Sequence, residues 1–310
     1  MARRLRVQYE GAIYHVINRG NYRRDVFETP ATAQSFEATL AEACEQYRWR
    51  LHAFAIMRNH YHLALETPEA NLVEGMHWLQ TTFATRFNRF RSERGHLFQG
   101  RYQALLVEDA ASLARVVDYI HLNPVRAGIV AAGQVAAFRW SSLARFLKPA
   151  RPAWLVARDW LAANGYEETP EHWRDYVRHL VDLAGDRIAQ ERMGFTEMSR
   201  GWAIGSLAWR RAVAKDFAHL ALAPGLPRDE LREMQTARWQ QGLSDALANV
   251  GKTADDVERD AKSAPWKVAI ARRLRRERGA PTSWIAEQLK MGSASSVRVY
   301  LATRRDRLND

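Results

Sequence analysis

Over residues 12–123 the apolar side chains change their spacing, and this change constrains the fold more than any other feature of the sequence. Alternation, which puts every second side chain on one face of a strand, repeatedly gives way to steps of three and four, which line one face of a helix. The predicted strands span residues 12–18, 50–57, 61–66 and 102–108. The predicted helices span residues 31–47, 72–90 and about 112–123.

Turn and cap residues refine this pattern. Arg58 and Asn59 are the tight connection between the second and third strands, which therefore form a hairpin. Ser112 or its neighbour is expected to cap the last helix. Pro124 is expected to end that helix near residues 121–123, because proline has no N–H and restricts the residue before it.

The order of elements is strand, helix, strand, strand, helix, strand and helix. Its first six members match the split arrangement of ferredoxin-like folds, in which two helices cover one face of an antiparallel sheet and leave the other face available. We therefore expect an α+β fold, with a ferredoxin-like antiparallel sheet and its helices followed by an all-α C-terminal region.

Composition divides the chain into three predicted regions, residues 1–148, 153–262 and 263–310. The stretch from Lys148 to Pro152 has the composition of a linker, and helical spacing follows it. Residues 241–263 are polar enough to form a loose connector. We expect a sheet domain, a helical middle region and a separate basic C-terminal region.

The C-terminal region is the most basic part of the chain. Residues 267–310 hold eleven Lys and Arg against four Asp and Glu. Cap and stop residues predict a helix from Pro265 to Gly279, a second beginning near Thr282, and a third over residues 294–302. The tight turn before the third suggests a helix-turn-helix that would present Arg298 to DNA. A basic three-helix bundle packed on the rest of the chain is the alternative.

The whole chain is basic, with 46 Lys and Arg, 35 Asp and Glu, and a net charge of +11. Such a balance favours an anionic partner, either a nucleic acid or a membrane surface. No segment approaches the roughly 20 apolar residues of a membrane span, and no signal-peptide stretch is visible, so we expect a cytoplasmic protein. Cys44 is the only cysteine, which excludes an internal disulfide and a cysteine zinc site.

His60 and His62 are the first candidates for chemistry. They stand two apart on a predicted strand, so both imidazoles project from one face and can reach one ion. A histidine pair is weak support by itself, because hydrogen-bonded structural histidines outnumber metal ligands. A metal site therefore needs a further ligand from another part of the fold.

Tyr119 and Asn123 are the next candidates, four apart on the last turn of a predicted helix and therefore on one face. The Asn123 amide oxygen and two imidazoles would make an N,N,O site with open positions, suited to Mg²⁺ or Mn²⁺, although these ligand types also admit Zn²⁺. Taken singly, Tyr119 has the character of a core residue, and Asn123 that of a helix terminator before proline.

Four motifs occur in order along residues 5–145. They are NRGN at 18–21, NHYHL at 59–63, GHLFQGRY at 95–102 and YIHLNPVRAG at 119–128, and Trp140-Ser141-Ser142 follows them. Together they resemble REP-associated tyrosine transposases, relatives of the single-tyrosine insertion-sequence transposases in the HUH nuclease superfamily. Residues 282–292 are similar to the helix-turn-helix extension of some long members. One departure is Arg58, which stands where the family usually has proline.

The resemblance implies an HUH-type catalytic domain over residues 1–148 that cuts and rejoins single-stranded DNA at hairpin-forming repeats. His60, His62 and Asn123 would hold the Mg²⁺ or Mn²⁺ ion that polarises the scissile phosphate. The Tyr119 oxygen would attack that phosphate and leave a 5′-phosphotyrosine and a free 3′-hydroxyl. A second DNA end could then restore the bond without ATP, in keeping with the lack of a Walker-type glycine loop. Relatives act as monomers or homodimers.

Basic residues beside this apparatus are candidate contacts to DNA phosphates, the alternative being a solvated basic face. They are Arg19, Arg58, Arg86, Arg89, Arg101 and Arg126. His15, on the first strand, is interpreted as a hydrogen-bonded core histidine. Two other functions stay open. A non-catalytic or domesticated sequence-specific DNA-binding regulator is favoured by the basic tail, and an RNA-binding protein only by the ferredoxin-like sheet.

Overall fold

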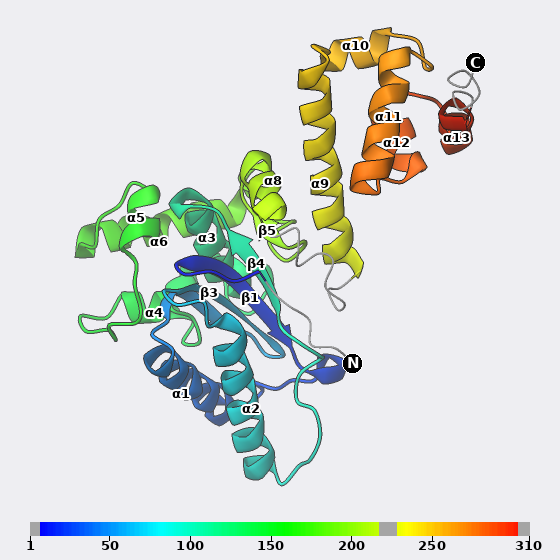
Figure 1. The fold of residues 1–310 in the computed structure, drawn as a ribbon. Helices are drawn as coiled ribbons and strands as arrows, with labels where there is room; N and C mark the ends of the chain where they lie inside the picture. The colour runs from blue at the N-terminus through cyan, green and yellow to red at the C-terminus, as the bar shows by residue number, and fades with distance from the viewer. Residues whose placement is uncertain (1–6, 217–227, 303–310) are drawn as a thin grey trace, which may run out of the picture. The chain divides into compact units, whose positions relative to one another are not determined.

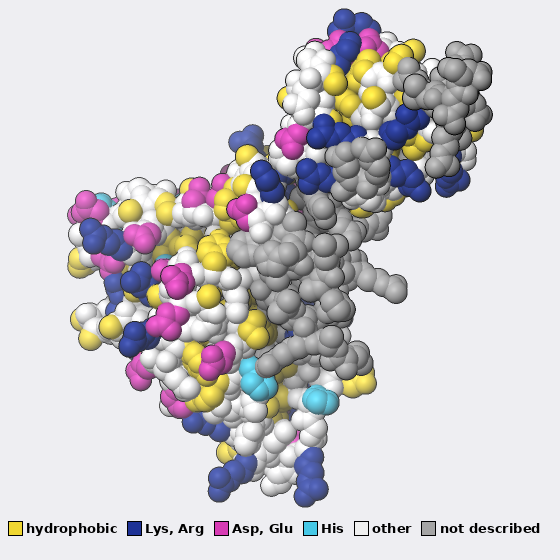
Figure 2. Space-filling model, viewed as in Figure 1, with side chains coloured by type: hydrophobic (Ala, Val, Ile, Leu, Met, Phe, Trp, Pro, Cys, Tyr) yellow, Lys and Arg dark blue, Asp and Glu magenta, His cyan; other side chains and the backbone are white. Residues whose placement is uncertain are grey.

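A computed structural model describes residues 7–216 and 228–302 (Figure 1). The chain forms two compact units, which meet in the sequence between Ser206 and Leu207. Figure 2 shows Lys and Arg side chains on the surface of both units. The units do not follow the three predicted regions, because the expected linker at 148–152 lies inside the first unit and residue 207 already begins the second.

A five-stranded sheet organises the first unit, in the order β2-β3-β1-β4-β5. Its strands are β1 (Ala12–Arg19), β2 (Arg50–Ile56), β3 (His60–Thr67), β4 (Gln103–Val107) and β5 (Ala203–Ile204). The first four strands pair antiparallel, as predicted. The fifth, which the sequence did not predict, adds parallel to β4. The fold class is therefore confirmed, with one short parallel strand added at an edge.

Helices α1 (Pro30–Gln46) and α2 (Leu72–Arg91) cover one face of the sheet (Figure 1). Aromatic rings fill the space between the layers. Phe36 of α1 lies 4.6 Å from Tyr61 of β3 and 5.0 Å from Phe83 of α2, measured between ring centroids. All three side chains are fully buried, and each contributes about 1.5–3 kcal/mol through the area it removes from water.

Helix α3 (Ala110–Arg126) packs on the opposite face, across β2 and β3. Its Tyr119 ring lies 5.7 Å from the ring of His62, whose side chain points away from the face that Tyr61 occupies. The expectation that this second face stays available was therefore wrong where α3 lies. The reason is that α3 carries an apolar stripe of its own, including Val116 and Ile120, which has to be buried.

Both ends of α3 differ from the prediction. Its first turn is capped by Asp109, whose carboxylate accepts a hydrogen bond from the Ser112 N–H at 2.8 Å, so Ser112 is the capped residue and not the cap. The helix also continues through Pro124, where it was expected to stop. The turn remains closed because the Ala127 N–H donates to the Asn123 carbonyl at 2.9 Å. The candidate site residues of α3 therefore stand within the helix.

The chain after α3 wraps the edge of the sheet. Its helices are η2 (Ala132–Ala137), α4 (Leu143–Phe146), α5 (Arg158–Ala163), α6 (Pro170–Gly185) and α7 (Arg187–Arg192). The Leu51 N–H of β2 donates to the Trp154 carbonyl at 2.7 Å, and the Ile56 N–H donates to the Trp140 carbonyl at 2.8 Å. These bonds satisfy backbone groups that an exposed edge strand would leave open. They explain why this part of the chain belongs to the sheet unit.

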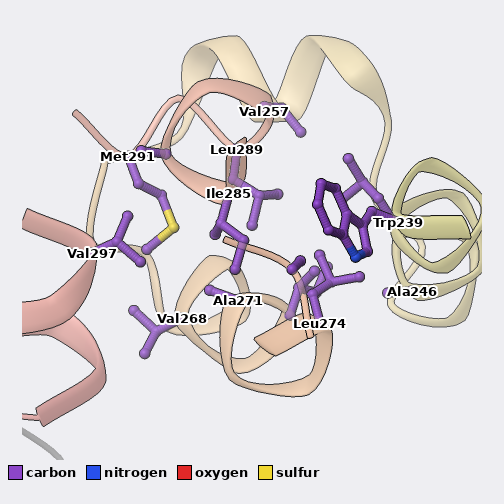
Figure 3. Packing of buried hydrophobic residues seen from close by; sticks show 14 residues of the cluster. Trp239, Ala246, Val257, Val268, Ala271, Leu274, Ile285, Leu289, Met291 and Val297 are labelled. Carbon is purple, nitrogen blue, oxygen red and sulfur yellow. The ribbon is translucent and has the colours of Figure 1, made fainter. Parts of the chain in front are cut away.

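The second unit is helical. It contains α8 (Leu207–Asp216), α9 (Arg228–Asn249), α10 (Ala254–Arg259), α11 (Pro265–Arg278), α12 (Thr282–Gln288) and α13 (Ala294–Ala302). The last three helices lie where the sequence predicted them. Figure 3 shows apolar side chains of α9 to α13 meeting in one cluster. The loose connector expected at 241–263 was wrong, because Leu243 and Val257 are buried in this cluster. None of the helices described is long and apolar enough to cross a membrane.

Candidate active site

Strand β3 brings the two candidate ligand histidines together. His60 and His62 project from the same face because they are two residues apart, and their ring centroids lie 5.1 Å apart. This is the face on which α3 packs. The juxtaposition expected from the H-x-H spacing is therefore present in the structure.

The His60 ring is oriented by its neighbour Asn59. The His60 Nδ1 lies 2.7 Å from the Asn59 Oδ1, which can only accept, so Nδ1 carries the proton and donates. Asn59 also donates from its Nδ2 to the Arg23 carbonyl at 3.3 Å. Burial lowers the pKa of His60 to about 4, and the charge of Arg19 acts in the same direction. At neutral pH the ring is uncharged, and its Nε2 carries a lone pair.

The His62 ring is buried and contacts a third histidine. Burial holds the pKa of His62 well below its usual range, and the nearby His15 and His60 rings lower it further. Its Nδ1 lies 3.0 Å from the His15 Nε2. His15 is fully buried, and burial lowers its pKa to about 4, although its hydrogen bond to the Met198 carbonyl opposes the shift. The interpretation of His15 as a hydrogen-bonded core histidine fits, but one of its partners is a candidate ligand.

Tyr119 of α3 lies against this histidine cluster. Its ring centroid is 5.7 Å from that of His62 and 5.8 Å from that of His15, both in edge-to-face geometry. The Arg126 guanidinium lies over the Tyr119 ring, 4.8 Å from its centroid. A phenol, two candidate ligand imidazoles and a cation are thus gathered at one place on the sheet.

The covering segment, which follows α7 and includes Phe195, Met198 and Ser199, packs over the candidate nucleophile Tyr119. The Ser199 hydroxyl lies 2.9 Å from the Tyr119 hydroxyl, and the Phe195 ring packs edge-on to Tyr119 at 5.5 Å. Only 7% of Tyr119 is exposed as a result. Phe195, Met198 and Ser199 could not be predicted as site residues, since no motif or spacing marks them. They reach the site only through the tertiary fold.

Asn123 lies one helical turn beyond Tyr119 and is buried. Its Nδ2 donates to the Tyr119 carbonyl at 3.0 Å, within the same helix. The hydrogen bonds and ring contacts described above join the two histidines to Tyr119 and His15, whereas the hydrogen bond of Asn123 stays within α3. Its role as a third ligand therefore remains a prediction.

The donors present would fit a divalent cation whose remaining positions are filled by water and phosphate oxygens. Two neutral imidazoles and an amide oxygen would leave such positions open on Mg²⁺ or Mn²⁺. Within residues 7–216 and 228–302, no group of three or more His, Cys, Asp or Glu side chains could hold a metal ion. The charges of Arg19 and Arg126 also act on His62. Such a site suits a cation that binds together with an anionic phosphate.

The candidate phosphate-contacting arginines occupy different environments. Arg58 pairs with Asp25 at 2.7 Å, and Arg86 forms a two-pronged ion pair with Glu42 at 2.7 and 2.8 Å. Both guanidinium groups are exposed but already pair with carboxylates of this chain. Arg126 is exposed as well and lies over the candidate nucleophile. The remaining candidates are also exposed: Arg19, Arg89, Arg101 and, in the second unit, Arg298.

Known proteins resemble this chain over its sheet unit. Residues 8–123 match the family described as Transposase IS200 like. A putative REP-associated tyrosine transposase of Haemophilus influenzae (strain ATCC 51907 / DSM 11121 / KW20 / Rd) is 29% identical over 106 residues, which cover 31% of this chain and 60% of that relative. A REP-associated tyrosine transposase solved in complex with a REP hairpin is 18% identical, with a TM-score of 0.41, and the match covers 52% of this chain and 93% of that one.

Proposed function

We propose that this chain, a member of the IS200-like transposase family through its residues 8–123, nicks single-stranded DNA beside hairpin-forming repeats and rejoins it through a phosphotyrosine. The proposal is carried by one observation, the packing of the Tyr119 ring at 5.7 Å from His62 and beneath Arg126. The phenol of Tyr119 therefore lies beside a neutral imidazole that would bind a cation and beside a guanidinium that would neutralise phosphate charge.

In the proposed reaction the Tyr119 oxygen attacks the scissile phosphorus. The Tyr119 O–P bond forms as the P–O3′ bond breaks, the phenol loses its proton, and the departing 3′-oxygen gains one. His60, His62 and Asn123 would hold Mg²⁺ or Mn²⁺, which supplies charge stabilisation at the phosphate. Arg126, which lies over the Tyr119 ring, would neutralise phosphate charge beside the nucleophile. Because the phosphodiester becomes a phosphotyrosine, a second strand can reverse the step without ATP.

The test is formation of a covalent adduct. The full chain is incubated with single-stranded hairpins that carry a randomised single-stranded foot and a fluorescent 3′ end, with Mg²⁺, Mn²⁺ or EDTA. We expect a fluorescent protein band that survives SDS, requires the metal, and is lost in both His60→Ala and His62→Ala. Failure to form any adduct in Mg²⁺ or Mn²⁺, or an adduct indifferent to EDTA, would refute the proposed chemistry.

We further propose that the second unit contacts duplex DNA through α13. Arg275 of α11 and Arg298 of α13 are exposed, and Figure 2 shows Lys and Arg side chains gathered along one side of this unit. The turn between α12 and α13 uses positive φ angles at Lys290 (51°) and Gly292 (87°). A short helix reached by such a turn, with basic residues beside it, has the dimensions of a recognition helix.

Arg298→Ala is expected to weaken binding of duplex DNA by about three- to tenfold and to reduce the slope of log Kd against log salt by about 1, because one phosphate contact is lost. The measurement is fluorescence anisotropy of a labelled duplex between low and moderate salt. Arg259→Ala is the matched control, since Arg259 is exposed in the same unit but pairs with Asp256 at 3.7 Å. An equal loss in both variants would argue against a specific role for α13.

A further inference from the structure

We propose that His15 is a positioning residue that holds His62 with its proton on Nδ1, so that Nε2 is the metal-binding nitrogen. The inference rests on the metal site of the proposed function and names a residue outside its ligand set. Its support is a chain of two hydrogen bonds that begins at the Met198 carbonyl and ends at His62.

The Met198 carbonyl oxygen sets the direction of both hydrogen bonds. The His15 Nδ1 lies 2.7 Å from the Met198 carbonyl oxygen, which can only accept, so the His15 Nδ1 carries a proton and donates. In a neutral imidazole the other nitrogen is then an acceptor. The His15 Nε2 lies 3.0 Å from the His62 Nδ1, which must therefore donate. That places the lone pair of a neutral His62 on Nε2.

The arrangement at His60 has the same polarity. There the Asn59 Oδ1 accepts from the His60 Nδ1 at 2.7 Å, which also leaves Nε2 as the lone-pair nitrogen. Both histidines of the pair thus offer the same nitrogen, each through a different acceptor. An outer acceptor that fixes the tautomer and orientation of a ligand histidine usually changes metal affinity by about 10–100-fold when it is removed.

Because both rings are buried, His62 depends on His15 as the acceptor for its Nδ1–H. His15 is fully buried and His62 is 3% exposed, so water cannot readily replace the acceptor that His15 provides. The two ring planes are inclined by only 27° and their centroids lie 5.2 Å apart, so the rings meet edge to edge, as an N–H···N bond in the ring planes requires. Met198, whose carbonyl accepts the hydrogen bond from His15, lies outside residues 8–123. The segment after α7 therefore takes part in orienting the candidate ligand His62.

Two measurements test the inference. Long-range ¹H–¹⁵N correlation spectra of the full chain with ¹⁵N-labelled histidine, free of metal at pH 7.5, report which nitrogen of His62 carries the proton. We expect the Nδ1–H form in the wild type and a shift towards the Nε2–H form in His15→Leu. Manganese affinity, measured from the EPR signal of free Mn²⁺ without DNA, is expected to fall by about 10–100-fold in His15→Leu.

A conservative variant and a matched control separate positioning from packing. In His15→Gln the amide oxygen can stand near the position of the lost Nε2, so this variant should recover most of the affinity and the Nδ1–H form. His52→Leu removes another buried histidine of the same sheet, on β2, and should leave both readouts unchanged.

An Nε2–H form of His62 in the wild type overturns the inference even if His15→Leu does not fold. So does an unchanged Mn²⁺ affinity in a folded His15→Leu. Absence of DNA cleavage with the expected tautomer and Mn²⁺ affinity would instead count against the proposed function and leave the relay intact.

Discussion

Tyr119→Phe is expected to abolish the covalent protein–DNA adduct and to lower nicking by at least about a thousandfold, because the substitution removes the only oxygen of the proposed nucleophile. The ring contacts with His62 and Arg126 should persist, since they involve the ring and not the hydroxyl. The loss of one hydrogen bond to Ser199 should cost about 1 kcal/mol of stability. The measurement is adduct yield and nicking rate on a single-stranded hairpin with Mn²⁺.

Two control variants show whether Tyr119→Phe loses activity because the nucleophile is gone or because a hydrogen bond is lost. Tyr14→Phe removes the hydroxyl of another buried tyrosine, on β1, which bonds the Val7 carbonyl at 3.3 Å, and it should keep the adduct. Ser199→Ala breaks the same hydrogen bond as Tyr119→Phe but retains the phenol, so it should also keep the adduct. Substantial nicking by Tyr119→Phe would assign the attack to another group, such as water.

The spacing of apolar residues predicted the four antiparallel strands because the side chains of a strand alternate between its two faces, whereas an amphipathic helix repeats every three or four residues. Strand β5 has no such pattern, since it contains only Ala203 and Ile204. It is a strand because Leu106 and Glu108 of the β4 edge donate to carbonyls of this segment. Pairing of that kind is a tertiary event that local sequence does not encode.

Helix α3, which continues through Pro124, shows a different limit of prediction from local sequence. A proline removes one backbone hydrogen bond and disfavours helical geometry before it, so a boundary was the expected result. In the structure, burial of the last turns of α3 against the sheet unit outweighs that local preference, and Asn123 and Pro124 are both buried. Local propensity is a weak guide where packing holds the helix in place.

Some features of the candidate site could be predicted from local spacing, whereas others depend on the tertiary fold. The spacing of His60 and His62 fixes a shared face of a strand, and that of Tyr119 and Asn123 a shared face of a helix, so each pair could be predicted locally. That the pairs come together was expected only from the resemblance to a known family. Met198 and Ser199 were not predictable, because Ser199 lies 80 residues from its partner Tyr119 and is brought there by the covering segment.

His121, two residues after the candidate nucleophile, is expected to make the sheet unit lose stability in acid. It is fully buried, and its nitrogens lie 2.9 Å from the Tyr176 hydroxyl and 2.8 Å from the Ser142 hydroxyl. Burial lowers the pKa of His121 to about 3. Between that value and about 6.5 the unfolded chain binds a proton that the folded chain excludes, so stability falls as the pH falls through this window.

The expected loss of unfolding free energy follows from the same coupling between proton binding and unfolding. Two pH units inside the window, from about 6.5 to 4.5, cost about 3 kcal/mol of unfolding free energy for His121 alone, because each unit is worth about 1.4 kcal/mol. Urea unfolding of the full chain, followed by circular dichroism at pH 7.5 and 4.5, measures this loss. His121→Leu should lower the stability at pH 7.5 by about 1–3 kcal/mol, since Ser142 and Tyr176 lose their partner.

The same variant should reduce the acid-dependent loss by about 3 kcal/mol, because the proton-binding group is gone. His77→Gln is the matched control, as His77 is exposed on α2 and its substitution should leave the wild-type pH dependence in place. A His121→Leu protein that loses as much stability in acid as the wild type would place the acid sensitivity elsewhere. The expected result would instead mean that the polar contacts joining α3 to α6 hold the Tyr119 helix only while the His121 ring is neutral.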